Sequence, residues 1–447
     1  MISLVSLRLP RLNWRLLGLL VGSYWLTGCV DSFQPEFNAT VNVVVVDGTI
    51  TNLPESQVIR LNRSRADPFT GRFGNIPLTK AQVQVIVDGS QVVNAHETVE
   101  GSYQLPSDFR GQVRHSYQLR FRLEDGSQYE SSPQIMPDVP PIDRVYAQFN
   151  PRVPRPNQPN AFMGAHEFYL DMSDPADQQN YYKWDWKLYE KQAWCRSCTQ
   201  GIYAVYNIIP GRYMFGAYYV SGDQLYEDCF NQPPNVAREG GPPYHNELWY
   251  YDYTCRTQCW EILHNYTLNL FDDALVNGNA ILGRKVALIP YYQRSPCLVE
   301  IRQSALTKEA HRFFKLVETQ TQNTGGLADT PPSAPVGNVK NTANARENVV
   351  GFFGASAASV VRYWLDRKDA TGMPVAAFDD KGNPLLNNEE LFYALNGRRP
   401  EPEPYPPYTG ERLEPKMQIW GGPPRVPTAI CVPSDSRTPF KPEGWQE

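Results

Sequence analysis

The sequence predicts a mainly β protein, because turn-forming residues are frequent, β-branched and aromatic residues alternate with polar ones, and helical spacing is rare. The 447 residues include 39 prolines, 31 glycines and 26 tyrosines, which favours short strands and many turns over long helices. Hydrophobic residues make up 41% of the chain and charged residues 20%, as is typical of globular proteins with a core. We expect a β-rich N-terminal domain, a larger β-rich second domain with one or two short helices, and a proline-rich C-terminal tail.

The first 28 residues are typical of a secretory signal. A basic start is followed by the apolar run Leu16–Leu26, which is about half as long as the ~20 residues that span a bilayer. The run ends in Leu26-Thr27-Gly28-Cys29, which is similar to a bacterial lipobox, where the cysteine is acylated, for example with palmitate, and becomes the mature N-terminus. The alternative is an ordinary signal with a chance cysteine. We expect residues 1–28 to be removed, Cys29 to be lipidated and residues 29–38 to form a tether.

Residues 39–136 show the alternation of short β-strands. The expected strands include Thr40–Val46, followed by Asp47-Gly48, then Ile50–Ser64, Ala81–Val87 before Asp88-Gly89, and Tyr117–Leu123 before Asp125-Gly126. In the last of these, aromatic and leucine side chains alternate with glutamine, arginine and glutamate, so one face is apolar. About seven strands in roughly 100 residues, with turns every 8–12 residues, predict a β-sandwich of immunoglobulin or transthyretin type.

A proline-dense connection, Met136–Pro141, separates this domain from a second β-rich domain, which we place at residues 142–370. Its expected strands include His166–Met172, Tyr181–Tyr189, Val349–Phe353 and Val360–Leu365. In the second strand, Tyr182, Trp184 and Trp186 share one side.

One helix is expected at Lys308–Thr319, with Thr307 as its N-cap. Its apolar side chains recur at helical spacing, so this face should pack on a sheet. Residues 371–447 are expected to form an extended tail, because twelve prolines lie within 397–447 and proline at this density does not support helices or sheet interiors.

Seven cysteines lie beyond Cys29, and in an exported protein they are candidates for disulfides. They are Cys195, Cys198, Cys229, Cys255, Cys259, Cys297 and Cys431. Because seven is odd, at least one should stay free or pair outside the chain. Cys195-x2-Cys198 and Cys255-x3-Cys259 also resemble the two halves of a zinc site, or a redox motif. However, 56 residues separate the two halves, against the ~15–20 of common zinc ribbons.

Aromatic residues gather shortly before and within this cysteine-rich region: Tyr244, Trp249, Tyr250, Tyr251, Tyr253 and Trp260. Flat rings offer a large contact area at low entropic cost, so the first five can form a surface that binds sugar or protein. The alternative is that these side chains fill the core around Cys255 and Cys259.

The sequence contains no G-x-S-x-G nucleophile elbow, H-E-x-x-H zinc helix, P-loop or dinucleotide-binding fingerprint. A net charge of −5 and a pI near 5.8 argue against nucleic acid as a partner. Asp171, Asp174 and Asp177 are spaced by three, which does not match the ligands of a known calcium loop and favours a solvated turn. His264 and His311 have no evident metal or catalytic partner. We therefore assign no catalytic residue, no metal ligand and no cofactor, although two acidic side chains are enough for a glycosidase.

Several short motifs follow one another in a fixed order. They are VVVVDGTITNLPESQVIRLNRS after Cys29, Tyr181-Tyr182-x-Trp184, Thr254-Cys255 with Cys259-Trp260, Val299–Phe314, Gly337–Asn341, Val350–Ser356 and Cys431–Trp445. Together they resemble a family of Bacteroidota-type envelope lipoproteins, domain of unknown function 4249. The tail departs from the family's pattern, because such proteins often have a cysteine pair there and only Cys431 is present. Its disulfide partner is therefore open, with Cys297 one candidate.

The resemblance implies an outer-membrane lipoprotein encoded near a TonB-dependent receptor, with no catalytic residues to carry over. We therefore expect a non-catalytic accessory protein that docks on the receptor barrel and helps to capture a substrate of unknown identity. Asp31 after Cys29 favours the cell surface, with the periplasmic face as the alternative. Two rival functions are an envelope structural or assembly protein and an enzyme that degrades glycan or peptide.

Overall fold

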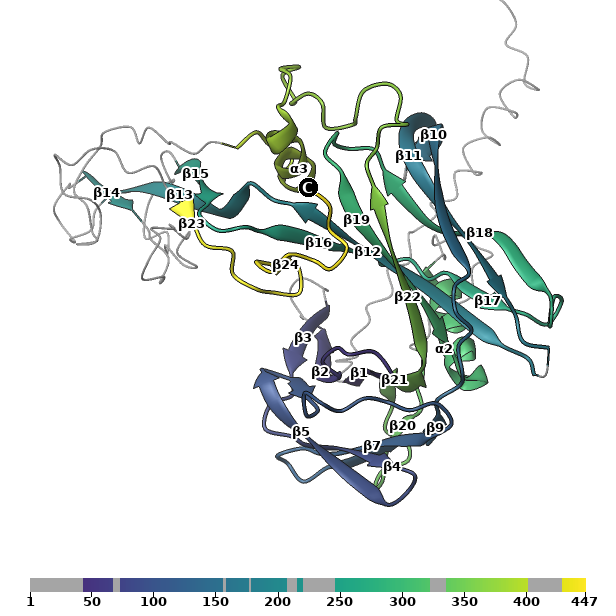
Figure 1. Ribbon diagram of the computed structural model, residues 1–447. Coiled ribbons are helices and arrows are strands. Elements are labelled where there is room, and N and C mark those ends of the chain that lie inside the picture. The colour runs from purple at the N-terminus through teal and green to yellow at the C-terminus, as the bar shows by residue number, and fades with distance from the viewer. Residues whose placement is uncertain are drawn as a thin grey trace, which may run out of the picture. The chain divides into compact units, whose positions relative to one another are not determined.

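The computed structural model describes residues 43–66, 73–155, 158–176, 178–206, 215–219, 246–321, 335–400 and 428–447 (Figure 1). In these ranges it contains 24 β-strands and two α-helices, so the prediction of a mainly β protein is confirmed. The secretory signal, Cys29 and the tether lie outside the described residues. Neither described helix has the length and apolar character needed to span a bilayer.

Eleven strands form the N-terminal sheet. They are β1 (Val43–Thr51), β2 (Val58–Ala66), β3 (Phe73–Pro77), β4 (Gln82–Val87), β5 (Gln91–Val99), β6 (Ser102–Gln104), β7 (Ser116–Arg122), β8 (Gln128–Ser131), β9 (Gln134–Ile135), β20 (Val339–Asn341) and β21 (Val349–Ser356). Their order is β20-β8-β7-β4-β5-β6-β2-β1-β21, with β3 on β2 and β9 on β7. Inward side chains of β1, β2, β4, β7 and β21 share one buried core. The immunoglobulin- or transthyretin-like form of this domain stays a prediction.

The predicted apolar face of Tyr117–Leu123 is buried in this core, as the alternation requires. The turn expected at Asp88-Gly89 is also present, and both residues have the positive φ angles, +50° and +71°, of a tight connection. Asp47-Gly48, in contrast, does not end a strand. The first strand continues through both residues because they pair with β21, and the second strand begins only at Val58.

The N-terminal sheet is not made from residues 39–136 alone. β21 pairs in parallel with β1 from Val44↔Val349 to Thr51↔Ser356, and β20 pairs with β8. At Gly351 the φ angle is +98°, and a Cβ atom would lie 1.9 Å from the carbonyl oxygen of Val46, so this close approach requires glycine. The alternation of apolar residues shows that 349–356 is a strand, but it does not show which sheet the strand joins.

Two further sheets pack face to face in the second region. The first contains β10 (Arg144–Arg155), β11 (Gln158–Ser173) and β18 (Ala280–Pro290). The second contains β12 (Tyr181–Lys191), β16 (Trp260–His264), β17 (Leu270–Asp272), β19 (Cys297–Ala305), β22 (Ala358–Leu365) and β24 (Arg437–Thr438). Their shared core includes Tyr182 and Trp184, which are fully buried, with Trp186 packed against it. The predicted aromatic side of β12 is therefore its core side.

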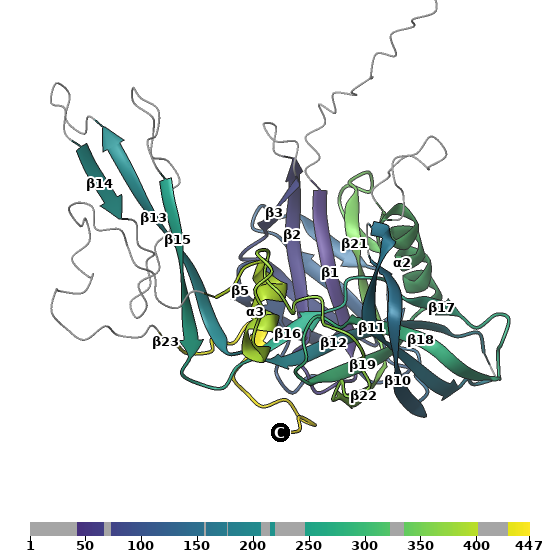
Figure 2. The same ribbon diagram turned by 90° about the horizontal axis from the view of Figure 1, so that it is seen from above.

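A four-stranded sheet carries most of the cysteine-rich region. It consists of β13 (Trp194–Tyr206), β14 (Phe215–Tyr219), β15 (Asn246–Cys255) and β23 (Thr428–Ala429), which lie side by side in the order β14-β13-β15-β23 (Figure 2). β23 comes from the C-terminal end and pairs in parallel with the last residues of β15.

The predicted helix is present as α2 (Lys308–Thr321), and the N–H of Ala310 donates to Oγ1 of Thr307, which confirms the N-cap. Phe313 and Phe314 pack against Phe352 of β21. The second helix, α3 (Asn387–Asn396), lies in the segment expected to be extended. The expectation was wrong there because the segment has helix-forming leucine, glutamate and alanine, whereas most of the proline-dense residues, 401–427, lie outside the described part of the chain.

Candidate functional site

β12, β19 and β22 lie side by side in one sheet (Figure 1). A charged trough crosses the outer face of this sheet. It consists of two adjoining hollows of about 590 and 550 Å³. Both hollows are lined by Glu55, Lys187, Glu300 and Arg302. Volumes of this size lie in the usual range for ligand sites.

The strand period of two explains why this face is charged. Successive side chains of a strand point to opposite sides, so the residues between the buried aromatic residues of β12 face outward. These are Lys183, Asp185 and Lys187. In the antiparallel register, Asp185 lies opposite Arg302 of β19 and Lys187 lies opposite Glu300. The same alternation therefore builds both the core and the trough.

Glu300 is the centre of a chain of alternating charges across three strands. Its Oε1 lies 3.0 Å from Nζ of Lys187, and its Oε2 lies 2.9 Å from Nε of Arg362 on β22. Arg362 continues the chain to Glu443 near the C-terminus. Burial by itself would raise the pKa of Glu300, but the charges and hydrogen bonds of Lys187 and Arg362 hold it below its ordinary value. Glu300 is only 3% exposed, so its charge depends on these two partners.

A second ion pair in the trough joins Arg302 of β19 to Glu55, which lies in the loop between β1 and β2. Nη1 and Nη2 of Arg302 donate to the two carboxylate oxygens of Glu55 at 2.9 and 2.6 Å. Burial would lower the pKa of Arg302, but the hydrogen bonds and charge of Glu55 raise it. A bidentate pair of this kind fixes orientation as well as distance.

The last residues of the chain line the trough on another side. Trp445 packs between Trp260 of β16 and Trp364 of β22, with ring centroids 5.8 and 4.9 Å apart. Upstream, Asp435 lies 3.4 Å from Arg60 of β2, and its carbonyl oxygen lies 2.8 Å from Nε2 of His264. The C-terminal segment thus contacts three strands that are far apart in the sequence.

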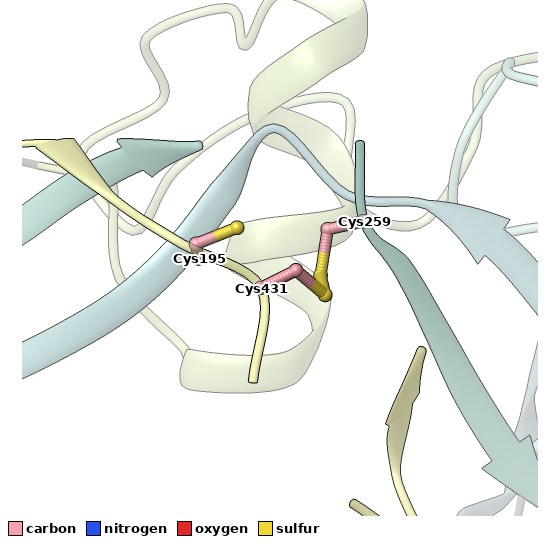
Figure 3. A group of neighbouring side chains, drawn as sticks. All are labelled: Cys195, Cys259 and Cys431. Carbon is pink, nitrogen blue, oxygen red and sulfur yellow. A yellow bond between two sulfur atoms is a disulfide. The ribbon is translucent and has the colours of Figure 1, made fainter. Parts of the chain in front are cut away.

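Disulfides hold this segment and the neighbouring sheet. Cys195 is bonded to Cys255. Cys259 is bonded to Cys431, and Figure 3 shows this bond with Cys195 beside it. The sulfur atoms of Cys195, Cys259 and Cys431 lie within 4.8 Å of one another, so the two disulfides are adjacent. Cys255 and Cys259, which resembled one half of a zinc site, therefore belong to different disulfides. Cys229 and the side chain of Cys198 lie outside the described part of the chain.

Cys297, one candidate partner of Cys431, instead has a free and fully buried thiol. It cannot reach the tail because β19 directs it into the core between the two sheets. There it lies 3.4 Å from Nη2 of Arg367, whose charge is balanced by the buried Glu190 at 2.8 Å. Burial raises the pKa of Cys297 to about 12, so this thiol stays protonated near neutral pH.

Of the five aromatic residues predicted to form a binding surface, Tyr253 is the one whose side chain lies in the described part of the chain. Tyr244 and the side chains of Trp249, Tyr250 and Tyr251 lie outside the described part of the chain, although the last three belong to β15. Tyr253 is buried beside the disulfides, in the same cluster as Cys195 and Cys259. For Tyr253, packing around the cysteines is therefore the correct alternative.

His264 and His311, for which the sequence suggested no metal or catalytic partner, each contact another residue of the chain. The ring of His311 packs on Tyr181 at 4.7 Å, and His264 contacts Asp435 as described above. Sequence reasoning missed the trough itself. The available signal was the polar half of the alternation in Tyr181–Tyr189, which we used only to predict a strand.

The trough is a polar hollow in which basic side chains orient the acidic ones. Residues 30–362 match the model of a protein family described as domain of unknown function (DUF4249). This match covers more than half of the chain, so the protein belongs to that family. No match was found among curated proteins or among solved structures.

Proposed function

We propose that this protein is a Bacteroidota-type lipoprotein, anchored in the outer membrane through Cys29, that binds a polar ligand in the charged trough without transforming it. The order of a basic start, the apolar run Leu16–Leu26 and a cysteine after Thr27-Gly28 supports the anchor. By the same proposal the protein faces the cell surface and acts as an accessory to a TonB-dependent receptor. Membership of the family and the β-rich fold are compatible with this role.

The pairing of charges in the trough is the observation that carries the binding function. Glu55 is held by Arg302, and Glu300 is held by Lys187 and Arg362. A general acid or base needs a pKa near the working pH, whereas the pKa of Glu300 lies below its ordinary value. Paired groups keep free lone pairs and N–H groups that can hydrogen-bond a sugar or a peptide. The arrangement therefore suits the recognition of a polar ligand better than proton transfer.

Fractionation and co-purification test the anchor and the receptor separately. The full chain and the Cys29→Ala variant are expressed in the native host, and membranes are dissolved in mild detergent. We expect the full chain in the outer-membrane fraction together with a TonB-dependent receptor, and the variant as folded protein outside that fraction. Retention of the variant in the membrane contradicts the anchor.

Repeated recovery of the anchored protein without a receptor contradicts the docking proposal. Loss of envelope integrity on deletion, without loss of uptake, would instead favour a structural or assembly role. Turnover of a glycan or peptide by the purified full chain would favour the enzyme.

A further inference from the structure

Two buried carboxylates meet at a place that the trough does not include. Asp174 follows β11, and Asp273 follows β17, 99 residues later in the chain. Asp174 is 7% exposed and Asp273 is 0% exposed. Each is held by the connection that carries the other, because Gly278, five residues after Asp273, donates to Asp174, and Asn180, six residues after Asp174, donates to Asp273. Two neighbouring acidic groups away from water repel each other unless a proton or a cation lies between them.

The partners of these carboxylates are neutral. The hydroxyl of Tyr182 donates to Oδ1 of Asp174 at 2.6 Å, and the N–H of Gly278 donates to Oδ2 at 3.0 Å. The N–H of Asn180 donates to Oδ2 of Asp273 at 2.8 Å. Among the described residues, no lysine, arginine or histidine forms an ion pair with either carboxylate. Burial, followed by the charge of Asp174, raises the pKa of Asp273.

Two oxygens at this place have no hydrogen-bond partner within the described ranges. They are Oδ1 of Asp273 and Oδ1 of Asn180, and both are buried. Asn180 is 5% exposed and lies directly against Asp273, whose N–H donates to its carbonyl oxygen at 3.2 Å. Buried acceptors without a donor are costly, and an ion that accepts oxygen ligands removes this cost.

We propose that Asp174, Asp273 and Asn180 form a calcium-binding site that joins the connection between β11 and β12 to the connection between β17 and β18. Calcium takes six to eight oxygen ligands in flexible geometry, and carboxylate and amide oxygens are its usual protein ligands. Magnesium fits less well, because it demands octahedral geometry and usually keeps several waters.

The proposed site differs from the calcium loop that the spacing of Asp171, Asp174 and Asp177 could suggest. Asp171 is directed elsewhere, because its Oδ1 accepts a hydrogen bond from the N–H of Gly283 at 2.8 Å. Asp177 lies outside the described residues. Only Asp174 of the three belongs to the proposed site, and its partner Asp273 is too distant in the sequence for any loop motif to reveal it.

Calcium binding by the full mature chain in detergent tests the proposal. After treatment with EDTA, thermal unfolding is followed with added CaCl₂ or MgCl₂, and Tb³⁺ luminescence is excited through tyrosine and tryptophan. We expect CaCl₂ to raise the melting temperature by a few degrees at saturation and MgCl₂ to have less effect. Tb³⁺ should bind with one strong site that calcium displaces, because Tyr182 touches Asp174 and can sensitise the ion.

Asp273→Asn is the decisive variant, and Asp272→Asn is its matched control. Asp272 is exposed, and its Oδ1 accepts hydrogen bonds that an asparagine Oδ1 also accepts. Asp273→Asn removes the repulsion without the ion, so the variant should fold but lose the calcium response, whereas Asp272→Asn should keep it. An equal calcium response in Asp273→Asn and the wild type, or no calcium response in the wild type, overturns the site. Neither result bears on the proposed anchor or on the trough.

Discussion

Lys187 and Glu300 face each other across β12 and β19, with Nζ of the lysine 3.0 Å from Oε1 of the glutamate. The same glutamate holds Arg362 on its other side. Because Glu300 is buried and both cations are partly exposed, the glutamate is the member of this group that cannot be lost without leaving charges unbalanced.

We predict that Glu300→Gln lowers the free energy of unfolding by about 1–3 kcal/mol, because two basic side chains then lose their common partner. Urea denaturation of the full chain measures the change. Glu443→Gln is the control, since the side chain of Glu443 is 88% exposed and its pair with Arg362 should contribute less than about 1 kcal/mol. Equal effects of the two substitutions would show that burial of Glu300 does not matter.

Stability should also depend on pH through Glu300. Its pKa in the folded protein is lower than the ordinary 4.5, so folding favours the ionised form. The contribution to stability is therefore complete above about pH 4.5 and is lost as the pH falls through the lower, folded-state value. Melting temperatures of the wild type and Glu300→Gln between pH 3 and 7 test this. The difference between the two proteins should shrink towards acid pH, and a constant difference would contradict the assignment.

Trp445→Ala should loosen the C-terminal segment at the trough. The substitution removes a ring that packs between Trp260 and Trp364, which we expect to lower the free energy of unfolding by about 1–3 kcal/mol. Limited proteolysis should cut the segment after Cys431 faster than in the wild type, while the disulfide to Cys259 retains the preceding residues. Phe440→Ala is the control, because Phe440 is 74% exposed. Equal cleavage rates in both variants would show that Trp445 does not hold the segment.

Local patterns in the sequence predict the elements better than their partners. The alternation in Tyr117–Leu123 and Tyr181–Tyr189 places both strands correctly, because burial of one face is a property of the strand itself. The pairing of β21 with β1 depends on contacts between residues some 300 positions apart, and no local pattern encodes it. The expectation that the first strand ends before Asp47-Gly48 was wrong for the same reason, since pairing with β21 overrides the turn tendency of this dipeptide.

The disulfides and the trough were likewise harder to predict than the strands, because they depend on residues far apart in the sequence. The disulfide between Cys259 and Cys431 joins residues 172 positions apart, so cysteine spacing alone could not select it. Glu300 and Arg362 look like ordinary exposed residues of two unrelated strands until the sheet brings them together. A polar site built across strands is therefore invisible in one sequence, even where each strand is predicted.

The parallel pair of β1 and β21 also constrains the order in which the chain can fold as it is synthesised. β1 is synthesised long before β21, and until residues 349–356 are made, one edge of β1 has unpaired N–H and carbonyl groups. Such an edge can join a strand of another molecule. The N-terminal region therefore needs either protection by other proteins or rapid delivery of the remaining chain, and a release of the chain before residue 349 would leave it prone to aggregation.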